Sequence, residues 1–362
     1  MKDVIIIGAG IIGSTVTYEL SKYDKDVMII EKKEAAGLAV TGHNSAIVHN
    51  GADPTENTLK AKYNVLGSKM YEAYCKELNT TYKQIGAFIV AKNKEDSQHI
   101  DELIDNARAR DVYVERLTKE QAKKLEPNLA DDIYEVLDMP TTAIVNPTHL
   151  SQQAINKAET NGVVTRFNEE VLAINKIEDG FEVVTDKGTY QTKAIINAAG
   201  LFAPNIEQMV SDPTFSLVMI RGEYLVLSQD AKKVASRVLY PVPSKSGKGV
   251  LVVPTVNNQI LIGPNAVDVN SPEDDYVTSE GISEIKEKIQ LIINEVPYEY
   301  EVDTFAGIRP KEKNNDFVIE ESKLVPFFFN LAGIDSPGIA SAPAIAIDFV
   351  HKTLKARLGL DK

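Results

Sequence analysis

Near its start the chain carries Val4-Ile5-Ile6-Ile7-Gly8-Ala9-Gly10-Ile11-Ile12-Gly13, the stretch that decides the fold. The β-branched run predicts a buried strand, the apolar residues from Ile11 to Lys22 recur at helical spacing, and Val27–Ile30 predicts a second strand. Three glycines lie where a βαβ unit needs a tight turn, room for a pyrophosphate, and close contact between helix and strand. The helix N-terminus then faces the phosphates.

A carboxylate stands where the second strand ends. Glu31 lies 18 residues after Gly13, where an acidic side chain accepts hydrogen bonds from both ribose hydroxyls of an adenosine. The same carboxylate repels a 2′-phosphate, so NADP is disfavoured. Strand, glycines, helix and acid together predict a dinucleotide-binding unit, but they leave open whether the dinucleotide is FAD or NAD.

Composition excludes several classes of protein. The chain has 362 residues, 43% of them hydrophobic, and a formal net charge of -13, so no nucleic-acid partner is expected. Cys75 is the single cysteine, which excludes an internal disulfide framework and a multi-thiolate metal site, and we predict no metal. The apolar opening is too short to span a bilayer and lacks the features of a signal peptide. We therefore expect no integral membrane segment and a cytoplasmic location.

The rest of the chain predicts further helices and a second group of strands. Apolar residues at helical spacing between Pro54 and Leu78 predict a helix, and Thr118 with Gln121 has the pattern of a capping box. Short alternating runs with tight-turn signals predict strands between residues 163 and 199. Other predicted elements are helices at 98–110, 119–125 and 279–294, and strands at 224–227, 250–253 and 260–263.

Three later segments place small or polar residues where a cofactor could be contacted. The first, Ile195-Ile196-Asn197-Ala198-Ala199-Gly200, runs from an apolar strand into small residues. The second, Leu331-Ala332-Gly333-Ile334-Asp335-Ser336-Pro337-Gly338-Ile339, precedes an Ala-rich helical run that contains Pro343. The third, Thr41-Gly42-His43-Asn44-Ser45 followed by His49, groups hydroxyl, amide and imidazole side chains. Taken singly, each segment also fits an ordinary strand end, helix start or polar loop.

In this order the segments resemble the D-amino-acid-oxidase-like superfamily of FAD enzymes, and most closely its short glycerol-3-phosphate oxidases. The most specific marks are Asn44-Ser45-Ala46-Ile47-Val48-His49-Asn50-Gly51, Gly247-Lys248-Gly249-Val250, Phe305-Ala306-Gly307-Ile308-Arg309-Pro310 and Ser336-Pro337-Gly338. The resemblance implies an α/β fold of the two-domain α+β type, with a Rossmann-like FAD-binding domain and a discontinuous antiparallel-sheet substrate domain. Because no Pro/Gly/Ser-rich linker is present, we predict an FAD-binding domain of residues 1–80, 145–215 and 305–362, and a substrate domain of residues 81–144 and 216–304.

The same resemblance implies roles for individual residues. His49 is the implied proton acceptor, and Ser45, Lys248, Arg309 and Ser336 are implied to contact the substrate. The predicted FAD contacts are Gly8, Gly10, Ile12, Gly13, Glu31, Thr41, Ser45, Ala46, Ile47, Val171, Gly200, Ile334, Asp335, Gly338 and Ala340. Val40, Gly42, Ala46 and Ala340 depart from the residues usual in the close relatives, so individual contacts there are less specific.

These residue types suit the oxidation of an anionic hydroxy compound. Flavin oxidises a secondary alcohol when hydride leaves carbon and a base accepts the hydroxyl proton, a role that neutral imidazole at His49 can fill. Arg309 offers a planar, permanently charged fork for phosphate or carboxylate, and Lys248 adds a point charge. Arg221 stays outside the predicted site, because an ion pair with Glu223 or another surface acid explains it better. His43 is expected to orient its loop.

We therefore expect FAD-dependent oxidation of glycerol 3-phosphate to dihydroxyacetone phosphate, with O2 reduced to H2O2. The alternatives are an L-2-hydroxyglutarate or other 2-hydroxy acid oxidase or dehydrogenase, an amine or amino-acid oxidase, and a flavin-binding redox sensor without turnover. An NAD-dependent dehydrogenase is disfavoured because the segments at 197–200 and 333–338 have no role in it. The pattern leaves open whether O2, a quinone or another carrier reoxidises the flavin, and whether the flavin is covalently attached.

Overall fold

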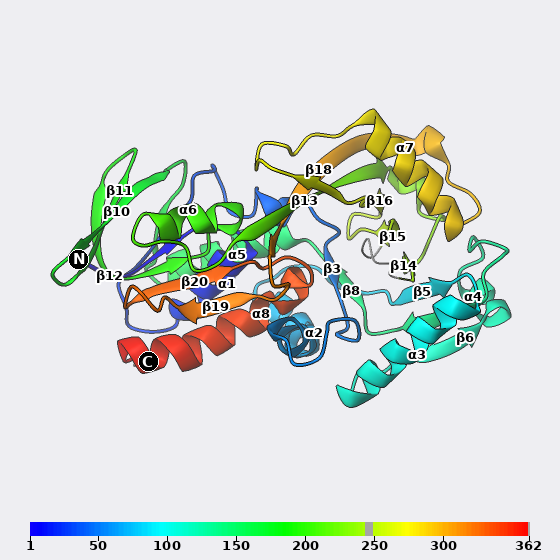
Figure 1. Cartoon of the computed structure of the whole chain (residues 1–362), viewed down its shortest axis with the longest axis horizontal. Coiled ribbons are helices and arrows are strands. Elements are labelled where there is room, and N and C mark those ends of the chain that lie inside the picture. Colours follow the sequence, from blue (N-terminus) through cyan, green and yellow to red (C-terminus); the bar gives the residue numbers. More distant parts are fainter. Residues whose placement is uncertain (243–248, 361–362) are drawn as a thin grey trace.

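The computed structural model describes residues 1–242 and 249–360. Within these residues the strands form three sheets, of eight, nine and three strands, called here sheet 1, sheet 2 and sheet 3. Figure 1 shows sheet 1 at the end of the molecule where both chain termini lie, and most of sheet 2 at the opposite end. The two large sheets thus lie toward opposite ends of the molecule.

Sheet 1 contains the βαβ unit predicted from the first thirty residues. Its strands in spatial order are β10 (Val171–Ile177), β11 (Gly180–Thr185), β12 (Thr189–Asn197), β1 (Lys2–Ile7), β2 (Val27–Ile30) and β9 (Val164–Arg166), with β20 (Phe328–Ala332) on β12 and β19 (Val318–Glu321) on β20. β1 pairs in parallel with β2 on one side and with β12 on the other. Because parallel strands carry their C-termini at one edge, the glycine turn after β1 lies beside the end of β12.

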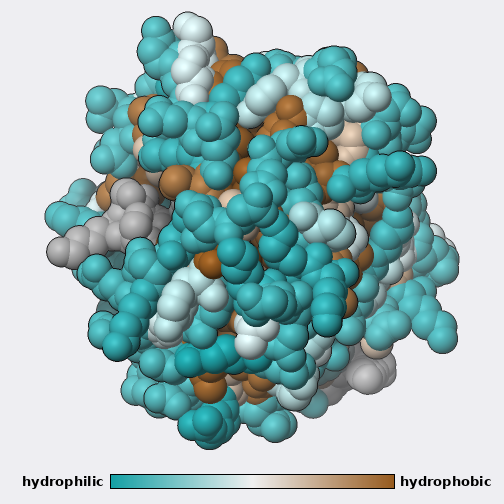
Figure 2. Space-filling model, turned by 90° about the vertical axis from the view of Figure 1, so that its right-hand side faces the viewer, coloured by the Kyte–Doolittle hydropathy of each residue, from teal (hydrophilic) through white to brown (hydrophobic). Residues whose placement is uncertain are grey.

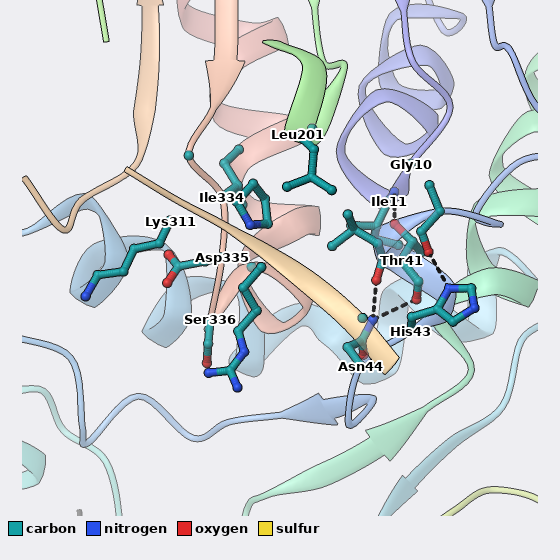
Figure 3. Close-up of a pocket in the computed structure, with 18 of the residues that line it drawn as sticks. Gly10, Ile11, Thr41, His43, Asn44, Leu201, Lys311, Ile334, Asp335 and Ser336 are labelled. Atoms are coloured by element: carbon teal, nitrogen blue, oxygen red, sulfur yellow. Dashed lines mark hydrogen bonds between the residues drawn. The ribbon is translucent and has the colours of Figure 1, made fainter. Parts of the chain in front are cut away.

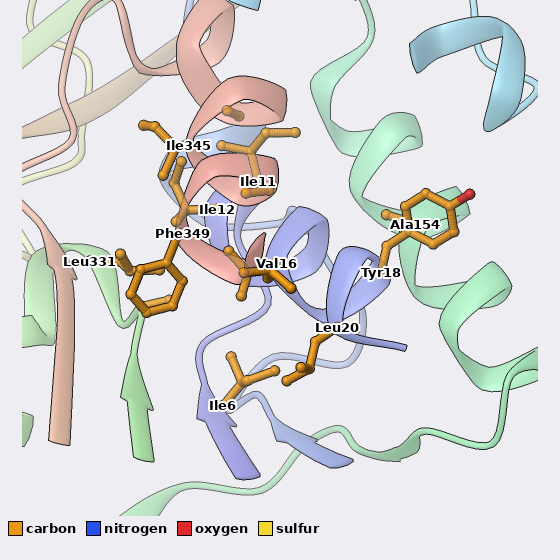
Figure 4. Close-up of a cluster of buried hydrophobic side chains, with 14 of the residues drawn as sticks. Ile6, Ile11, Ile12, Val16, Tyr18, Leu20, Ala154, Leu331, Ile345 and Phe349 are labelled. Carbon is orange, nitrogen blue, oxygen red and sulfur yellow. The ribbon is translucent and has the colours of Figure 1, made fainter. Parts of the chain in front are cut away.

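The residues of β1 alternate between two cores. Val4 and Ile6 belong to the core beneath a layer of helices, whereas Ile5 and Ile7 pack on the opposite side with residues of β10 and β11. The helix layer consists of α1 (Ile11–Leu20), α5 (Pro147–Thr160), α8 (Gly338–Asp348) and α2 (Leu59–Glu77). Figure 4 shows Ile12 of α1 beside Ile345 of α8, with Val16 of α1 and then Ile6 of β1 below them. Burial on both faces explains why this strand is a continuous apolar run.

Two helices of this layer approach unusually closely. A Cβ on Gly67 of α2 would lie 1.9 Å from the carbonyl oxygen of Ala340 in α8. Only glycine at this position allows the two backbones such an approach. The N-terminus of α8, and the loop before it, are therefore held firmly against α2.

Sheet 2 is mainly antiparallel. Its strands are β17 (Val267–Val269), β13 (Leu217–Leu227), β16 (Ile260–Gly263), β15 (Leu251–Pro254), β14 (Val238–Pro241), β5 (Ala87–Ala91), β7 (Glu135–Met139) and β6 (Glu115–Thr118), with β18 (Glu301–Glu312) paired to β13. One face packs on α4 (Lys119–Leu125) and α7 (Ser279–Lys288), and the other on α3 (Lys94–Ala109) and on sheet 3. The face at this end of the molecule is mostly hydrophilic, with hydrophobic residues in small separate patches (Figure 2).

Sheet 3 lies between the two large sheets in the packing. It consists of β3 (Ile47–Val48), β8 (Ala143–Val145) and β4 (Tyr82–Gln84). Ile47 joins the core of sheet 2, and Val48 joins the core under the helix layer. The remaining helical elements are α6 (Ala203–Gln208), α9 (Lys355–Leu358), the 3-10 turns at Val40–Gly42, Gly200–Phe202, Gln229–Ala231, Ile289–Leu291 and Tyr298–Tyr300, and a π-helical turn at Phe349–Leu354.

Local predictions agree with the structure in most places and fail where tertiary contacts intervene. Thr118 and Gln121 form the predicted capping box at the start of α4. The helix predicted to reach residue 294 ends at Lys288, because the segment after it pairs with the chain at residues 128–130. The predicted domain boundary at residue 305 falls inside β18, which pairs with β13 along most of its length. The domain division stays a prediction.

Among the residues described, no helix combines the length and the apolar character that crossing a membrane requires.

Candidate functional site

A cavity of about 1120 Å³ is lined by residues of both large sheets. Most of the predicted site residues line it, namely Gly8, Gly10, Ile12, Glu31, Thr41, Ser45, Ala46, Ile47, His49, Val171, Gly200, Arg309, Ile334, Asp335, Ser336 and Gly338. Gly13 and Ala340 lie beneath the lining, and Lys248 falls outside the described residues. Segments from five distant parts of the sequence thus meet at one cavity, and the individual contacts predicted for them stay predictions.

The glycine turn leaves no room for a Cβ at Gly8 or Gly13. Gly8 has φ +99°, and a Cβ there would lie 2.5 Å from the carbonyl oxygen of Ala198. A Cβ on Gly13 would lie 1.9 Å from the carbonyl oxygen of Gly8, so Gly13 lets the first turn of α1 pack on the strand end. Gly13 therefore has the packing role expected of the third glycine, which explains its absence from the lining.

The N-terminus of α1 opens toward the cavity. Ile11 N donates to Thr41 Oγ1 at 2.9 Å, which ties the 3-10 turn at Val40–Gly42 to the start of the helix. Figure 3 shows Gly10, Ile11 and Thr41 together on one side of the cavity, and Lys311, Asp335 and Ser336 on the other. A helix start of this kind favours a phosphate group.

Glu31 stands at the end of β2 with both carboxylate oxygens in use. Oε2 accepts from Ala9 N at 2.7 Å, and Oε1 accepts from Lys33 N at 2.9 Å. A carboxylate oxygen has more than one lone pair, so each can still accept a bond from a ribose hydroxyl. The glycine turn, the helix start and this acid together fit an adenosine diphosphate moiety.

The loop before α8 is fixed by a buried ion pair. Lys60 Nζ lies 2.6 Å from Asp335 Oδ1, and the two side chains are 9% and 10% exposed. Burial raises the pKa of the Asp335 carboxyl, while the charge of Lys60 acts in the opposite direction. Asp316 caps the start of α2 by accepting from Leu59 N at 2.9 Å and from Lys60 N at 3.0 Å. The ion pair holds the loop at 333–338 against the N-terminus of α2, and Asp316 fixes the start of that helix.

His49 follows β3 and is half-buried at the cavity wall. Its backbone oxygen accepts from Asn64 Nδ2 of α2 at 2.6 Å. Its ring Nδ1 lies 3.1 Å from the hydroxyl of Tyr240 in β14. His49 is thus held by the helix layer through its backbone and by sheet 2 through its ring.

Arg309 lies on β18 and also lines the cavity. Its Nη2 donates to the carbonyl oxygen of Asn265 at 3.1 Å. Within residues 1–242 and 249–360 it makes no ion pair with a carboxylate, whereas the nearby Arg221 lies 3.0 Å from Glu223, as the sequence predicted. An arginine at a cavity wall that makes no ion pair within the part of the chain that the structure describes is suited to an anionic ligand.

Ser45 contacts an aromatic residue that the sequence analysis missed. Its Oγ lies 3.1 Å from the hydroxyl of Tyr224, and the Tyr224 ring stacks on Phe305 with centroids 4.6 Å apart. Burial raises the pKa of the Tyr224 phenol, and the nearby charge of Arg309 opposes that shift. No local signal marks Tyr224, since it lies 179 residues from Ser45 in sequence.

His43 has the loop-orienting contact expected of it. Its Nδ1 lies 2.9 Å from the carbonyl oxygen of Ala39, and its ring meets Phe305 edge to face. Its backbone oxygen would lie 2.1 Å from a Cβ on Gly307, so β18 passes close over this loop. The 3-10 turn that carries Thr41 is therefore held in place from both sides.

Comparison with known proteins gives a family and close relatives. A family model described as DAO, FAD dependent oxidoreductase, matches residues 3–350. A glycerol 3-phosphate dehydrogenase of Caloramator mitchellensis is 37% identical over 350 residues, which cover 96% of this chain and 72% of that protein. A glycerol 3-phosphate oxidase of Mycoplasma genitalium is 31% identical over 98% of this chain and 96% of its own length.

A solved structure matches the whole architecture. The dithionite-reduced L-alpha-glycerophosphate oxidase of Mycoplasma pneumoniae with FAD bound has a TM-score of 0.93 and 31% identity, covering 97% of this chain and 94% of that one. The predicted two-domain fold class is thereby confirmed. An L-2-hydroxyglutarate dehydrogenase of Escherichia coli is more distant, with 27% identity over 74% of this chain and 64% of that protein.

Proposed function

This chain belongs to the family of FAD-dependent oxidoreductases, and on that premise we propose that it oxidises glycerol 3-phosphate to dihydroxyacetone phosphate. The observation that carries the proposal is that Arg309, which has no acid partner among the described residues, and His49 line the same cavity. An anion site and a proton acceptor are the two groups that oxidation of a phosphorylated alcohol requires.

FAD is the cofactor, and the residues present fit it. The glycine turn and the N-terminus of α1 would hold its pyrophosphate, Glu31 would accept from its ribose, and the loop at 333–338 would contact the other end. When bound, FAD supplies the two-electron acceptor for the hydride that leaves the alcohol carbon. The protein contributes the rest of the chemistry.

The main contact with the substrate would come from the wall made by sheet 2. The guanidinium of Arg309 would hold the phosphate through its two parallel N–H groups, with Ser336 and Lys248 as further predicted contacts. The carbonyl of Asn265 fixes one Nη of the fork, which sets the direction in which the others point. Orientation of the phosphate would in turn place the carbon that carries the hydroxyl.

His49 would accept the hydroxyl proton as hydride leaves the carbon that carries this hydroxyl group. In its neutral form an imidazole has one ring nitrogen without a hydrogen, and that nitrogen can accept the proton. The atoms balance, because the alcohol loses one proton to His49 and one hydride to the cofactor and becomes a ketone.

Reoxidation by O2, with release of H2O2, is the second part of the proposal. The Mycoplasma relative is named an oxidase and the Caloramator relative a dehydrogenase, so both kinds of acceptor occur among similar proteins. We propose O2 as acceptor and the cytoplasm as the location.

L-2-hydroxyglutarate is the second candidate substrate. A guanidinium grips a carboxylate as well as a phosphate, and the Escherichia coli relative acts on that hydroxy acid according to its name. The two substrates differ in the group that Arg309 would meet, so a direct comparison separates them.

The test is an anaerobic titration of the flavin-loaded protein with glycerol 3-phosphate, followed by admission of air. We expect bleaching of the flavin absorbance, then its return with formation of one H2O2 per flavin. Bleaching by L-2-hydroxyglutarate alone would replace the substrate proposed here. Recovery of colour only with a quinone or another carrier would replace the acceptor. A flavin that no hydroxy acid bleaches would favour a redox sensor.

A further inference from the structure

Behind His49 lies a buried tyrosine whose hydroxyl meets the imidazole. Tyr240 is 4% exposed and belongs to the core between sheet 2 and sheet 3, together with Ile47 and Ile144. Its hydroxyl lies 3.1 Å from His49 Nδ1, and the two ring centroids are 5.9 Å apart. Tyr240 is not among the residues that line the cavity, so it reaches the site through His49.

We propose that Tyr240 is a positioning residue that fixes the orientation and the tautomer of His49, so that Nε2 is the nitrogen that accepts the substrate proton. The inference rests on the proposed role of His49 as base. In a neutral imidazole one nitrogen carries the proton, and the bond made at one nitrogen selects the state of the other. When Nδ1 carries the proton and donates to the Tyr240 oxygen, as we propose, Nε2 keeps its lone pair.

The chemistry of the phenol supports a positioning role and excludes a role as base. Burial raises the pKa of the Tyr240 phenol well above its usual value, and the negative charge of Asp53 adds to the shift. The hydroxyl therefore stays neutral and protonated at physiological pH. Its oxygen can accept from Nδ1–H both before and after His49 takes up a proton, and the bond strengthens when the ring becomes cationic.

The tyrosine is itself held rigidly. Tyr240 stands opposite Ile89 in the parallel pairing of β14 with β5, and its neighbour Leu239 pairs with Val252 of β15. A strand paired on both sides keeps its side chains in fixed directions. The backbone of His49 is anchored separately by Asn64, so ring and backbone are positioned by different parts of the molecule.

The experiment measures single-turnover reduction of the bound flavin by glycerol 3-phosphate in anaerobic stopped flow. Tyr240→Phe removes only the hydroxyl. We expect the limiting rate to fall roughly tenfold to hundredfold, as for other partners that orient a functional histidine, while the half-saturating substrate concentration changes less than twofold. The double variant with His49→Gln should be no slower than His49→Gln alone, because the two residues act as one unit.

Tyr71→Phe is the matched control. Tyr71 is buried as well, its hydroxyl has no hydrogen-bond partner among the described residues, and it lies in α2 outside the lining of the cavity. Its rates should equal those of the wild type, with all variants compared at equal flavin content. The inference is overturned if Tyr240→Phe reacts within twofold of wild type, if only its half-saturating concentration rises, or if it slows His49→Gln further.

Failure of the proposed function has a different signature. In that case the wild-type flavin itself is not reduced by glycerol 3-phosphate, and the series is repeated with L-2-hydroxyglutarate, to which the same predictions apply. If neither substrate reduces the wild-type flavin, both the function and the role of Tyr240 are overturned.

Discussion

The two walls of the cavity differ in what they present to it: one presents mainly backbone and the other mainly side chains. The wall at sheet 1 presents mainly backbone, at Gly8, Gly10 and the loop before α8. Its shape depends on glycines, which have no Cβ. The wall at sheet 2 presents side chains, above all Arg309 and Tyr224. Its ability to bind a ligand depends on the charge and the hydroxyl group that these side chains carry. The first wall should therefore be damaged by adding a methyl group, and the second by removing a charge or a hydroxyl.

The largest effect is expected from Gly13→Ala. The new Cβ would lie 1.9 Å from the carbonyl oxygen of Gly8, so the start of α1 must shift from the strand. We expect a loss of about 3 kcal/mol in the free energy of unfolding and of most bound flavin. Gly188→Ala is the control, because its Cβ would meet no atom closer than 3.4 Å. Thermal unfolding and flavin content measure both, and a Gly13→Ala protein with full flavin would break the comparison.

Arg309→Met should impair substrate binding and leave the cofactor in place. Loss of the charge removes the partner of the anion, and we expect KM for glycerol 3-phosphate to rise about a hundredfold at unchanged flavin content. Arg309→Lys keeps the charge without the fork and should raise KM about tenfold. Steady-state kinetics distinguish the two, and an equal KM for wild type and Arg309→Met would remove Arg309 from the site.

Glu31→Gln tests a charged side chain of the backbone wall, at the end of β2. An amide offers a single weaker acceptor where the carboxylate offers two, so the dissociation constant of FAD should rise about tenfold. The fold should persist, because Gln can still accept from Ala9 N. Glu178→Gln, an exposed change in the turn after β10, serves as control. Fluorescence titration of the apoprotein with FAD gives both constants, and equal values would leave Glu31 without a role at the ribose.

The smallest effect is expected from ionic strength, which should change substrate binding at the wall of sheet 2. Raising the ionic strength from about 0.01 M to about 0.15 M shortens the Debye length from about 30 Å to about 8 Å. KM for the anionic substrate should then rise a few-fold with kcat unchanged, since Arg309 attracts the substrate by charge. The Arg309→Met variant should lose most of this dependence. A KM that is independent of salt in the wild type would argue against recognition by charge.

Sequence patterns predicted the backbone wall better than the side-chain wall. A βαβ unit is a local structure, and the spacing of its glycines and Glu31 follows from the geometry of one turn and one helix. The capping box at α4 and the ion pair of Arg221 with Glu223 are local as well, and the structure confirms both. Such features require no knowledge of distant partners.

Long-range pairing explains what the sequence could not provide. Tyr240 lies 191 residues from His49, and no spacing rule connects them. The pairing of β13 with β18 brings Tyr224 beside Phe305, and it also carries the predicted domain boundary into the middle of a strand. His49 and Arg309 could be proposed only through resemblance to a family, since an isolated histidine or arginine has no local signature of function.

The pairing of β20 with β12 has a consequence for biosynthesis. β20 joins sheet 1 in parallel at Ile195↔Phe328, and α8 closes over α1 only afterwards in the order of the chain. A ribosome therefore releases the glycine turn first and its covering segment more than three hundred residues later. A growing chain would hold flavin only weakly until the last strand and helix emerge. A chain that stops before β20 and α8 would lack part of the cavity wall, and we expect it to lose flavin readily.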